Sequence, residues 1–400
     1  MAVALPSEFL PVLSMVSRAP PYRGRVSRAR DEDACPGALQ VHQAADGALA
    51  RIRLPGGMIG PAALAALADT ADRFGGGTLE FTSRGNLQIR GIGDTTAVAG
   101  AVAEAGLLPS ASHERVRNIA ASPLSGRVGG LADIRPWVGE LDRAIQADPE
   151  LARLPGRFWF SLDDGSGDVS SLAADVGVHL VSADRAALLL AGRDTGVRVT
   201  RDDAVSALLE VARRFAEIRG HAWRVSELAE QDALLSEFDR ATDAGRRFPP
   251  ARPPIGWIEQ DQPGQIALGA AIPLGVLTAR QARFVAAVEA PVVITPWRSL
   301  VVADLPEAVA DTALRVLAPL GLVFDDTSPW LTVSACVGSP GCERSRADVR
   351  AEATRAAASG TTGVPVHYVG CERACGSPPS GTVLVATAEG YQPLVRPTVG

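Results

Sequence analysis

The chain has 400 residues, of which 46% are hydrophobic, enough for two or three domains with cores of their own. Its net charge of −6 argues against nucleic-acid binding, which normally requires a basic excess. No apolar run approaches the roughly 20 residues of a membrane span, and no basic segment followed by an apolar one opens the chain as a secretory signal would. These features predict a soluble, cytoplasmic protein with no nucleic-acid or membrane partner.

In chain order, residues 1–33 are rich in Pro, Ser and Arg without periodicity, and we expect a disordered leader there. A strand–helix–strand pattern follows. It predicts strands over 50–54, 78–81 and 87–90, and a helix over 61–74 that opens with proline and ends at three glycines.

A similar order returns in the second half of the chain. Leu54-Pro55-Gly56-Gly57 is echoed by Ile272-Pro273-Leu274-Gly275, after which we expect a helix over 279–289 and a strand over 292–295. Fainter echoes link residues 178–181 with 366–369, and 122–126 with 339–342. Two halves of similar design predict a duplication, with cysteine clusters retained in only one of them.

Between the repeats, residues 169–200 are predicted to form strands and 202–219 an amphipathic helix, and the proline-rich segment 246–254 is the best candidate linker. We therefore expect a first ferredoxin-like half over 34–110, a first α/β lobe over 111–245, a second ferredoxin-like half over 246–310 and a metal-binding α/β lobe over 311–400.

Four of the five cysteines lie together near the C-terminus, and they are Cys336, Cys342, Cys371 and Cys375. Their spacing, C-x5-C followed by C-x3-C, lies among glycines and prolines that let the backbone approach the sulfurs. A secreted disulfide scaffold would be shorter and would spread its cysteines more evenly. Clustered thiols of this kind favour a metal centre.

A cubane iron–sulfur cluster needs four converging thiolates, with backbone N–H groups near the sulfurs. We expect such a [4Fe–4S] cluster, with Cys342 at the start of a helix over 343–358, where the helix dipole favours a thiolate. Structural zinc, which prefers tighter C-x2–4-C pairs, and buried unliganded cysteines are the alternatives that the spacing leaves open.

Together with the cysteines, four arginine motifs occur in a fixed order, and in this combination the sequence resembles the sulfite and nitrite reductase superfamily. The motifs are Arg51-Ile-Arg53-Leu-Pro-Gly-Gly, Thr82-Ser-Arg84-Gly-Asn86-Leu-Gln88, Val116-Arg117-Asn118-Ile119 and Leu154-Pro155-Gly-Arg157-Phe158. The resemblance implies an α+β fold with a duplicated architecture, in which a pseudo-symmetric ferredoxin-like platform carries two α/β lobes.

The resemblance also implies roles for particular residues. Arg53, Arg84, Arg117 and Arg157 would bind the carboxylates of a tetrapyrrole and the small anion at its iron, and Cys375 would be the cluster ligand nearest to the tetrapyrrole. Bidentate arginine–carboxylate contacts suit such a ligand, since a uroporphyrinoid ring is an apolar disc with several ionised arms.

Three features resemble the cobalamin-pathway branch of this superfamily: the opening Ala34-Cys35-Pro36-Gly37, the short chain, and the segment after Pro155. Where sulfite reductases present two lysines, this chain has Arg157 and Trp159, and an indole cannot protonate a reducing oxyanion. The resemblance implies a monooxygenase that hydroxylates precorrin-3A at C20 and closes a γ-lactone. A siroheme-dependent nitrite or sulfite reductase is the alternative, and a non-catalytic protein with a structural or redox-sensing cluster is a third.

The branch implies a [4Fe–4S] cluster as electron source and a mononuclear non-haem iron where oxygen reacts, with siroheme expected only under the reductase alternative. The sequence does not settle the ligands of the second iron, because its five histidines form no H-x-H or H-x-D pair; His113 lies nearest to the expected pocket. No G-x-G-x-x-G fingerprint is present. We therefore expect electrons from a separate ferredoxin or reductase.

Overall fold

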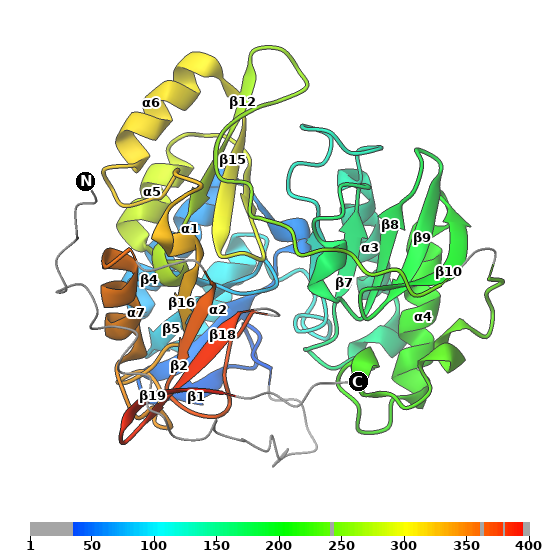
Figure 1. Cartoon of the computed structure of the whole chain (residues 1–400), viewed down its shortest axis with the longest axis horizontal. Coiled ribbons are helices and arrows are strands. Elements are labelled where there is room, and N and C mark those ends of the chain that lie inside the picture. Colours follow the sequence, from blue (N-terminus) through cyan, green and yellow to red (C-terminus); the bar gives the residue numbers. More distant parts are fainter. Residues whose placement is uncertain (1–34, 241–243, 361–363, 379–380, 395–400) are drawn as a thin grey trace, which may run out of the picture. The chain divides into compact units, whose positions relative to one another are not determined.

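A computed structural model of the chain describes residues 35–240, 244–360, 364–378 and 381–394 (Figure 1). The leader expected over 1–33 lies outside the described residues. Contacts within the chain define two compact units. The larger contains residues 35–43 and Gly47–Asp326, and the smaller contains Ala44–Asp46 and the described residues from Thr327 onward. Within the described residues, every helix is too short or too polar to cross a membrane.

The larger unit contains two five-stranded sheets with the same topology. In order across the first sheet, the strands are β1 (His42–Ala44), β2 (Gly47–Ile52), β5 (Leu87–Ile92), β4 (Thr78–Phe81) and β13 (Val276–Thr278). In the second they are β11 (Gly256–Glu259), β12 (Gln265–Ala271), β15 (Ser299–Pro306), β14 (Val292–Ile294) and β3 (Met58–Ile59). The predicted duplication is therefore confirmed by the sheet order.

Each half gives its short third strand to the sheet of the other half. Leu277 of β13 pairs with Leu79 of β4, and Ile59 of β3 pairs with Val292 of β14. The repeated Pro-containing segments form the 3₁₀ turns Pro55–Gly57 and Pro273–Gly275. Each turn directs the chain toward the sheet of the other half. Both turns need a left-handed backbone at the same two positions, with φ values of 64° and 70° in the first and 55° and 71° in the second. These turns explain why the motif is repeated in the sequence.

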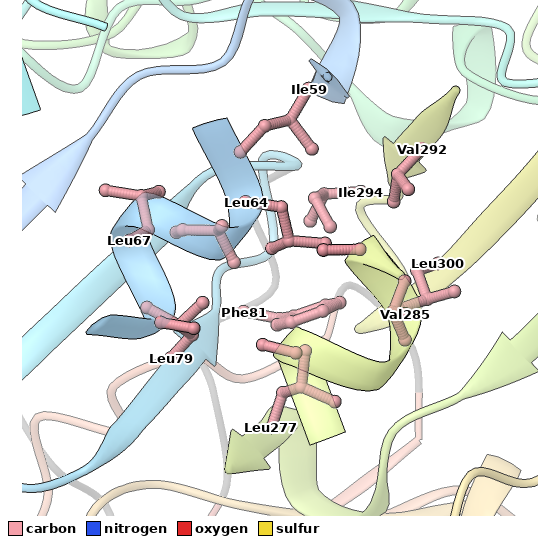
Figure 2. Packing of buried hydrophobic residues seen from close by; sticks show 14 of the residues in the cluster. Ile59, Leu64, Leu67, Leu79, Phe81, Leu277, Val285, Val292, Ile294 and Leu300 are labelled. Carbon is pink, nitrogen blue, oxygen red and sulfur yellow. The ribbon is translucent and has the colours of Figure 1, made fainter. Parts of the chain in front are cut away.

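Helices from both halves pack on these sheets and share one core. The helices are α1 (Pro61–Phe74), α2 (Thr95–Glu104), α5 (Ala279–Ala286) and α6 (Glu307–Leu317). Figure 2 shows the centre of this core, where Leu64 of α1 and Val285 of α5 lie among side chains from both sheets. Because the exchanged residues Ile59 and Leu277 belong to the same cluster, neither half encloses its core alone.

A third sheet carries the first lobe of the larger unit. Its strands, in order, are β10 (Arg193–Thr200), β9 (Arg185–Leu190), β8 (Val176–Leu180), β7 (Phe160–Asp163) and β6 (Ile119–Ala121), of which β6, β7 and β8 are parallel. Helices α3 (Arg135–Ala147) and α4 (Ala204–Ile218) lie beside it in Figure 1 and share its core. The expected linker segment starts on this lobe, since Phe248 packs against His179 with ring centres 4.4 Å apart.

The smaller unit has a four-stranded sheet of related design. Its strands are β16 (Val333–Ala335), β17 (Val366–Val369), β18 (Thr382–Thr387) and β19 (Gly390–Pro393), with the first three parallel, and α7 (Val349–Ala358) connects β16 to β17. By topology, β17 corresponds to β7. The expected echo of residues 178–181 in 366–369 is therefore wrong, because His179 lies on β8, the third parallel strand, and His367 on β17, the second.

Most predicted elements are confirmed within one or two residues, although β2 begins three residues before its predicted start and α5 ends three residues before its predicted end. The last helix differs more. We expected it to begin at residue 343, and it begins at Val349. Asp348 is the N-cap, and its carboxylate accepts a hydrogen bond from Ala351 N at 3.0 Å. The residues before it form turns, with Ser345 N donating to Cys342 O at 3.0 Å. The expectation that Cys342 lies at a helix N-terminus is thus wrong, since aspartate is the preferred cap.

Candidate functional site

Two buried asparagines join the arginine motifs of the larger unit. Asn86 accepts a hydrogen bond from Leu54 N at 2.8 Å through its side-chain oxygen and donates to the Asn118 side-chain oxygen at 3.2 Å. Asn118 in turn donates to the backbone oxygens of Gly156 and Phe158, both at 3.0 Å. Each asparagine is 1% exposed. Because a buried amide requires its partners, this network fixes the backbones that carry the four arginines.

Arg53 lies at the centre of this framework and is 2% exposed. Its Nε donates to Arg115 O at 3.2 Å and its Nη2 to Pro36 O at 3.2 Å and to the Cys35 sulfur at 3.4 Å. Arg51, two residues earlier and on the same strand face, donates to the same sulfur at 3.3 Å. Cys35 thus accepts hydrogen bonds from two guanidinium groups, and burial lowers the pKa of Arg53 to about 10.

The segment that carries Cys35 is held by a buried acid. The carboxylate of Glu114, which is 5% exposed, accepts hydrogen bonds from the backbone N–H groups of Ala38, Leu39 and Gln40 at 2.7, 2.8 and 3.0 Å. A Cβ at Gly37 would clash with this carboxylate, at 2.3 Å. The segment resembles an anion-binding turn whose ligand is a side chain of the protein itself. It places the thiol of Cys35 against the arginines.

Arg84 lies over the indole of Trp159, with its Cζ atom 5.4 Å from the ring centre. Burial, and then the positive charge of Arg224, lower the pKa of Arg84 to about 10. Among the described residues no carboxylate or carbonyl oxygen accepts a hydrogen bond from its guanidinium group. Arg84 is therefore charged at neutral pH, and the negative charges of Cys35 and Asp175 act on it without a direct hydrogen bond.

Arg224 approaches the same indole, at 6.0 Å from the ring centre, and is held by Asp175. Asp175 is fully buried and accepts hydrogen bonds from Arg224 Nε at 2.7 Å and from the backbone N–H of Trp159 at 3.1 Å. Burial raises the pKa of Asp175, and the arginine opposes that shift. One carboxylate therefore positions both the indole and the second cation.

The other two expected arginines lie in different surroundings. Arg117 forms a bidentate ion pair with Asp142, at 2.6 and 2.8 Å. Arg157 is exposed and lies over the ring of Trp223, at 5.0 Å. The structure thus brings Arg53 and Arg84 together with Arg51 and Arg224, two arginines that we did not single out from the sequence.

We call Arg51, Arg53, Arg84 and Arg224 the arginine cluster. Asp175 and the Cys35 sulfur are the acidic groups of this cluster. Asp175 accepts hydrogen bonds from Arg224 alone among these arginines, and its charge also acts on Arg84. Two donor atoms of the cluster, Arg51 Nε and Arg53 Nη1, are buried without an acceptor in the described residues. Burying such donors costs free energy, so the cluster is suited to an anionic ligand with several oxygens.

The histidines offer no ligand set for a second iron. His113, the one nearest to the arginine motifs, is 4% exposed and is satisfied by the Asp148 carbonyl at 2.9 Å and the Ser112 hydroxyl at 2.9 Å. Within the part of the chain that the structure describes, no three His, Cys, Asp or Glu side chains converge as a metal site. His113 therefore has a structural role, as does His179, which is hydrogen-bonded to Asp163 at 3.1 Å.

In the smaller unit, the two cysteine pairs follow adjacent parallel strands. Cys336 comes directly after β16, and Cys371 follows β17 after Gly370. Loops at the carboxyl ends of parallel strands lie at one edge of a sheet, where such folds bind ligands. His367 holds the second loop in place, because its Nε2 lies 3.0 Å from Cys375 O and its Nδ1 lies 2.8 Å from the Ser334 hydroxyl.

The four thiols influence one another electrostatically. Partial desolvation raises the pKa of both Cys371 and Cys375, and the charges of the other thiolates raise them further. Gly370 N donates to the Cys336 sulfur at 3.4 Å, the kind of N–H···S contact that surrounds iron–sulfur clusters. The donor set thus fits a [4Fe–4S] cluster in type and number, although the sulfurs do not converge to coordination distance here.

Comparisons with known proteins agree with this arrangement. The nitrite/sulfite reductase ferredoxin-like half domain matches residues 42–104. A precorrin-3B synthase from Sinorhizobium sp is 28% identical over 391 residues, covering 91% of this chain and 82% of that protein. A ferredoxin–nitrite reductase from Synechococcus elongatus is 26% identical over 394 residues, covering 82% of this chain and 74% of that protein.

The solved structure of the NirA protein of Mycobacterium tuberculosis has the same fold, with a TM-score of 0.68 at 20% identity over 86% of this chain and 73% of that one. The chain therefore contains the ferredoxin-like half domain of nitrite and sulfite reductases and shares its fold with a solved relative. Among these relatives, the precorrin-3B synthase is matched over the largest share of this chain.

Proposed function

We propose that the protein is a precorrin-3B synthase, a monooxygenase that hydroxylates precorrin-3A at C20 and closes a γ-lactone during aerobic cobalamin biosynthesis. The similarity to the Sinorhizobium enzyme along 91% of the chain supports this function. The observation that carries it is the arginine cluster, in which Arg84 donates no hydrogen bond to a carboxylate among the described residues and burial lowers its pKa. A substrate with many carboxylate arms would supply that partner.

The chemistry of the substrate suits the cluster. A precorrin carries ionised acetate and propionate arms around an apolar macrocycle, and a charge-assisted hydrogen bond to each arm contributes about 1.5–3 kcal/mol. Arg51 reaches the site from β2 and Arg53 from the residue directly after it, and Arg224 reaches it from a segment of the lobe. Arms on different sides of one ring could therefore be bound at the same time, which would fix its orientation for reaction at a single carbon.

In this proposal Cys336, Cys342, Cys371 and Cys375 hold the [4Fe–4S] cluster, which supplies electrons when bound. A ferredoxin or a separate reductase would deliver them, and oxygen would be the second substrate. A mononuclear iron remains an expectation from the resemblance, to which we assign no residue because the described residues contain no converging ligand group. The chain's own contribution is to bind the ring, orient it and exclude water around it.

A siroheme-dependent nitrite reductase is the second candidate, and the 26% identity to the Synechococcus enzyme is the observation in its favour. The two candidates differ in colour. A siroheme enzyme purifies with the absorption bands of a chlorin-type ring, whereas the synthase shows the broad absorption of an iron–sulfur cluster alone. A visible spectrum of the anaerobically purified protein therefore separates them.

Turnover tests the proposed function directly. The protein is purified without oxygen and mixed with precorrin-3A, a reductant and oxygen labelled with the heavy isotope, and the product is analysed by mass spectrometry. We expect a product that contains one labelled oxygen atom and a γ-lactone. Reduction of nitrite by the same preparation, without conversion of precorrin-3A, would overturn the proposal.

A further inference from the structure

The indole N–H of Trp159 has no hydrogen-bond acceptor among the described residues, although its Nε1 atom is buried. The residue is 5% exposed, and its ring packs with Ala120, Val169 and Ala174. A buried indole N–H usually finds a partner, because leaving it unsatisfied costs free energy. The orphaned donor therefore needs an explanation.

The position of Trp159 is determined by its backbone as well as its ring. Its own N–H donates to Asp175 Oδ2 at 3.1 Å, and it lies between Phe158 and Phe160, whose rings pack at 5.2 Å in the core of the lobe. The side chain consequently has little freedom to turn toward another acceptor. The unsatisfied N–H is thus part of the packed structure and persists in the ligand-free protein.

The surroundings of the indole indicate what the missing acceptor is. Two guanidinium groups, of Arg84 and Arg224, lie over the ring at 5.4 and 6.0 Å from its centre. A ligand cation would be repelled there, and a ligand group that only donates hydrogen bonds would leave the indole N–H unsatisfied. An anionic oxygen of a ligand would be attracted by both arginines and could accept a hydrogen bond from the indole N–H. The uncharged indole N–H of Trp159 adds a hydrogen bond of defined direction to this site without adding a third positive charge beside Arg84 and Arg224.

We propose that Trp159 is a specificity-determining residue whose indole N–H donates a hydrogen bond to a ligand carboxylate, the same carboxylate that neutralises Arg84. The inference deepens the proposed function and rests on it, since it assigns one arm of the tetrapyrrole to a defined subsite. The indole N–H is a buried donor without an acceptor among the described residues, and the ring packs among apolar residues. Trp159 therefore recognises an acidic arm, and stacking on the macrocycle is not its role.

The indole N–H of Trp159 has opposite effects on the stability of the free protein and on ligand binding. In the ligand-free protein the unsatisfied N–H costs free energy, so replacing the indole by a phenyl ring, in Trp159→Phe, should cost less stability than the lost buried ring area alone would predict. In the complex the same N–H is satisfied, so the same substitution should weaken ligand binding. A purely structural tryptophan would not show this combination.

The experiment measures binding of uroporphyrin III, a tetrapyrrole with eight carboxylates, by fluorescence at constant ionic strength, and urea unfolding of the ligand-free protein. The variants are Trp159→Phe, Arg84→Gln and the double variant. Trp257→Phe is the matched control, because Trp257 is 40% exposed on β11. We expect Trp159→Phe to raise the Kd about tenfold or more and Trp257→Phe to leave it unchanged.

The double variant shows whether both residues serve one carboxylate. If they do, the loss in the double variant is smaller than the product of the two single losses. An unchanged Kd for Trp159→Phe together with a weakened Arg84→Gln would overturn this inference and leave the proposed function standing. Failure of the wild-type protein to bind uroporphyrin III would remove both.

Discussion

Arg117 and Asp142 form a buried bidentate ion pair, in which Arg117 Nε donates to Asp142 Oδ1 at 2.6 Å and Nη2 donates to Oδ2 at 2.8 Å. The two side chains are 6% and 15% exposed. Arg84 has no such partner among the described residues. Although both arginines belong to the arginine motifs of the sequence, Arg117 forms an ion pair within the protein and Arg84 does not.

We expect Arg117→Gln to lower the free energy of unfolding by about 3 kcal/mol, because it leaves a largely buried carboxylate unpaired. Urea unfolding measures this loss, and Asp142→Asn combined with Arg117→Gln should recover part of it. Uroporphyrin III binding should change less than in Arg84→Gln. A loss of affinity as large as that of Arg84→Gln, with stability unchanged, would show that Arg117 binds the ligand directly.

We expect the sulfur of Cys35 to stabilise the fold as a hydrogen-bond acceptor. Cys35→Ala removes the sulfur that accepts hydrogen bonds from Arg51 and Arg53, and should cost about 1–3 kcal/mol of stability, since the guanidinium groups stay buried. Cys35→Ser keeps an acceptor and serves as the control, with most of the stability retained. Thermal unfolding of the two variants measures the difference. Equal stability of Cys35→Ala and wild type would contradict the assigned role.

Asp168 makes stability depend on pH. Burial raises its pKa from 3.8 to about 7, with further contributions from the charges of Asp163 and Asp164. A carboxyl whose folded-state pKa is raised stabilises the fold fully below its unfolded pKa and loses that contribution as pH rises through the folded pKa. Between about pH 4 and pH 7, wild type should therefore lose up to about 1.4 kcal/mol per pH unit relative to Asp168→Asn.

The measurement for Asp168 is urea unfolding of both proteins at a series of pH values. Asn can accept the hydrogen bonds that Ser122 and Val169 now donate to Asp168, at 2.7 and 2.6 Å, so the variant isolates the charge. Parallel stability curves for the two proteins would show that Asp168 ionises with an ordinary pKa.

The strand exchange predicts that the two ferredoxin-like halves unfold together. Leu277, which is fully buried, belongs to the second half and pairs in the sheet of the first. Leu277→Ala should cost about 2–5 kcal/mol and reduce hydrogen-exchange protection in both sheets alike, and Ile59→Ala should do the same from the other side. Loss of protection confined to the sheet that contains β13 would contradict a shared core.

The repeat could be predicted from the sequence because both copies need the same left-handed turn after a proline. The exchange of strands could not, since β3 has two residues and β13 three, too few to show any period. The faint histidine echo failed for a related reason, because three apolar or aromatic residues around one histidine suit any buried parallel strand.

The candidate site was predicted in part. Arg53 and Arg84 lie in the arginine cluster, and Arg51 could have been added, since alternate residues of one strand share a face. Arg224 and the acceptor role of Cys35 could not have been found, because each depends on a contact made only in the folded chain, with Asp175 and with the two arginines. The predicted helix start at residue 343 was wrong, because Asp348 caps the helix five residues later.

Iron and acid-labile sulfide analysis of the anaerobically purified protein tests the central claim, that the C-terminal thiols hold a redox cluster. We expect about four iron and four sulfide per chain in wild type. Cys375→Ser should lose the intact cluster and Cys35→Ser should keep it. Zinc at one ion per chain, or a protein that binds uroporphyrin III yet contains no acid-labile sulfide, would contradict the account.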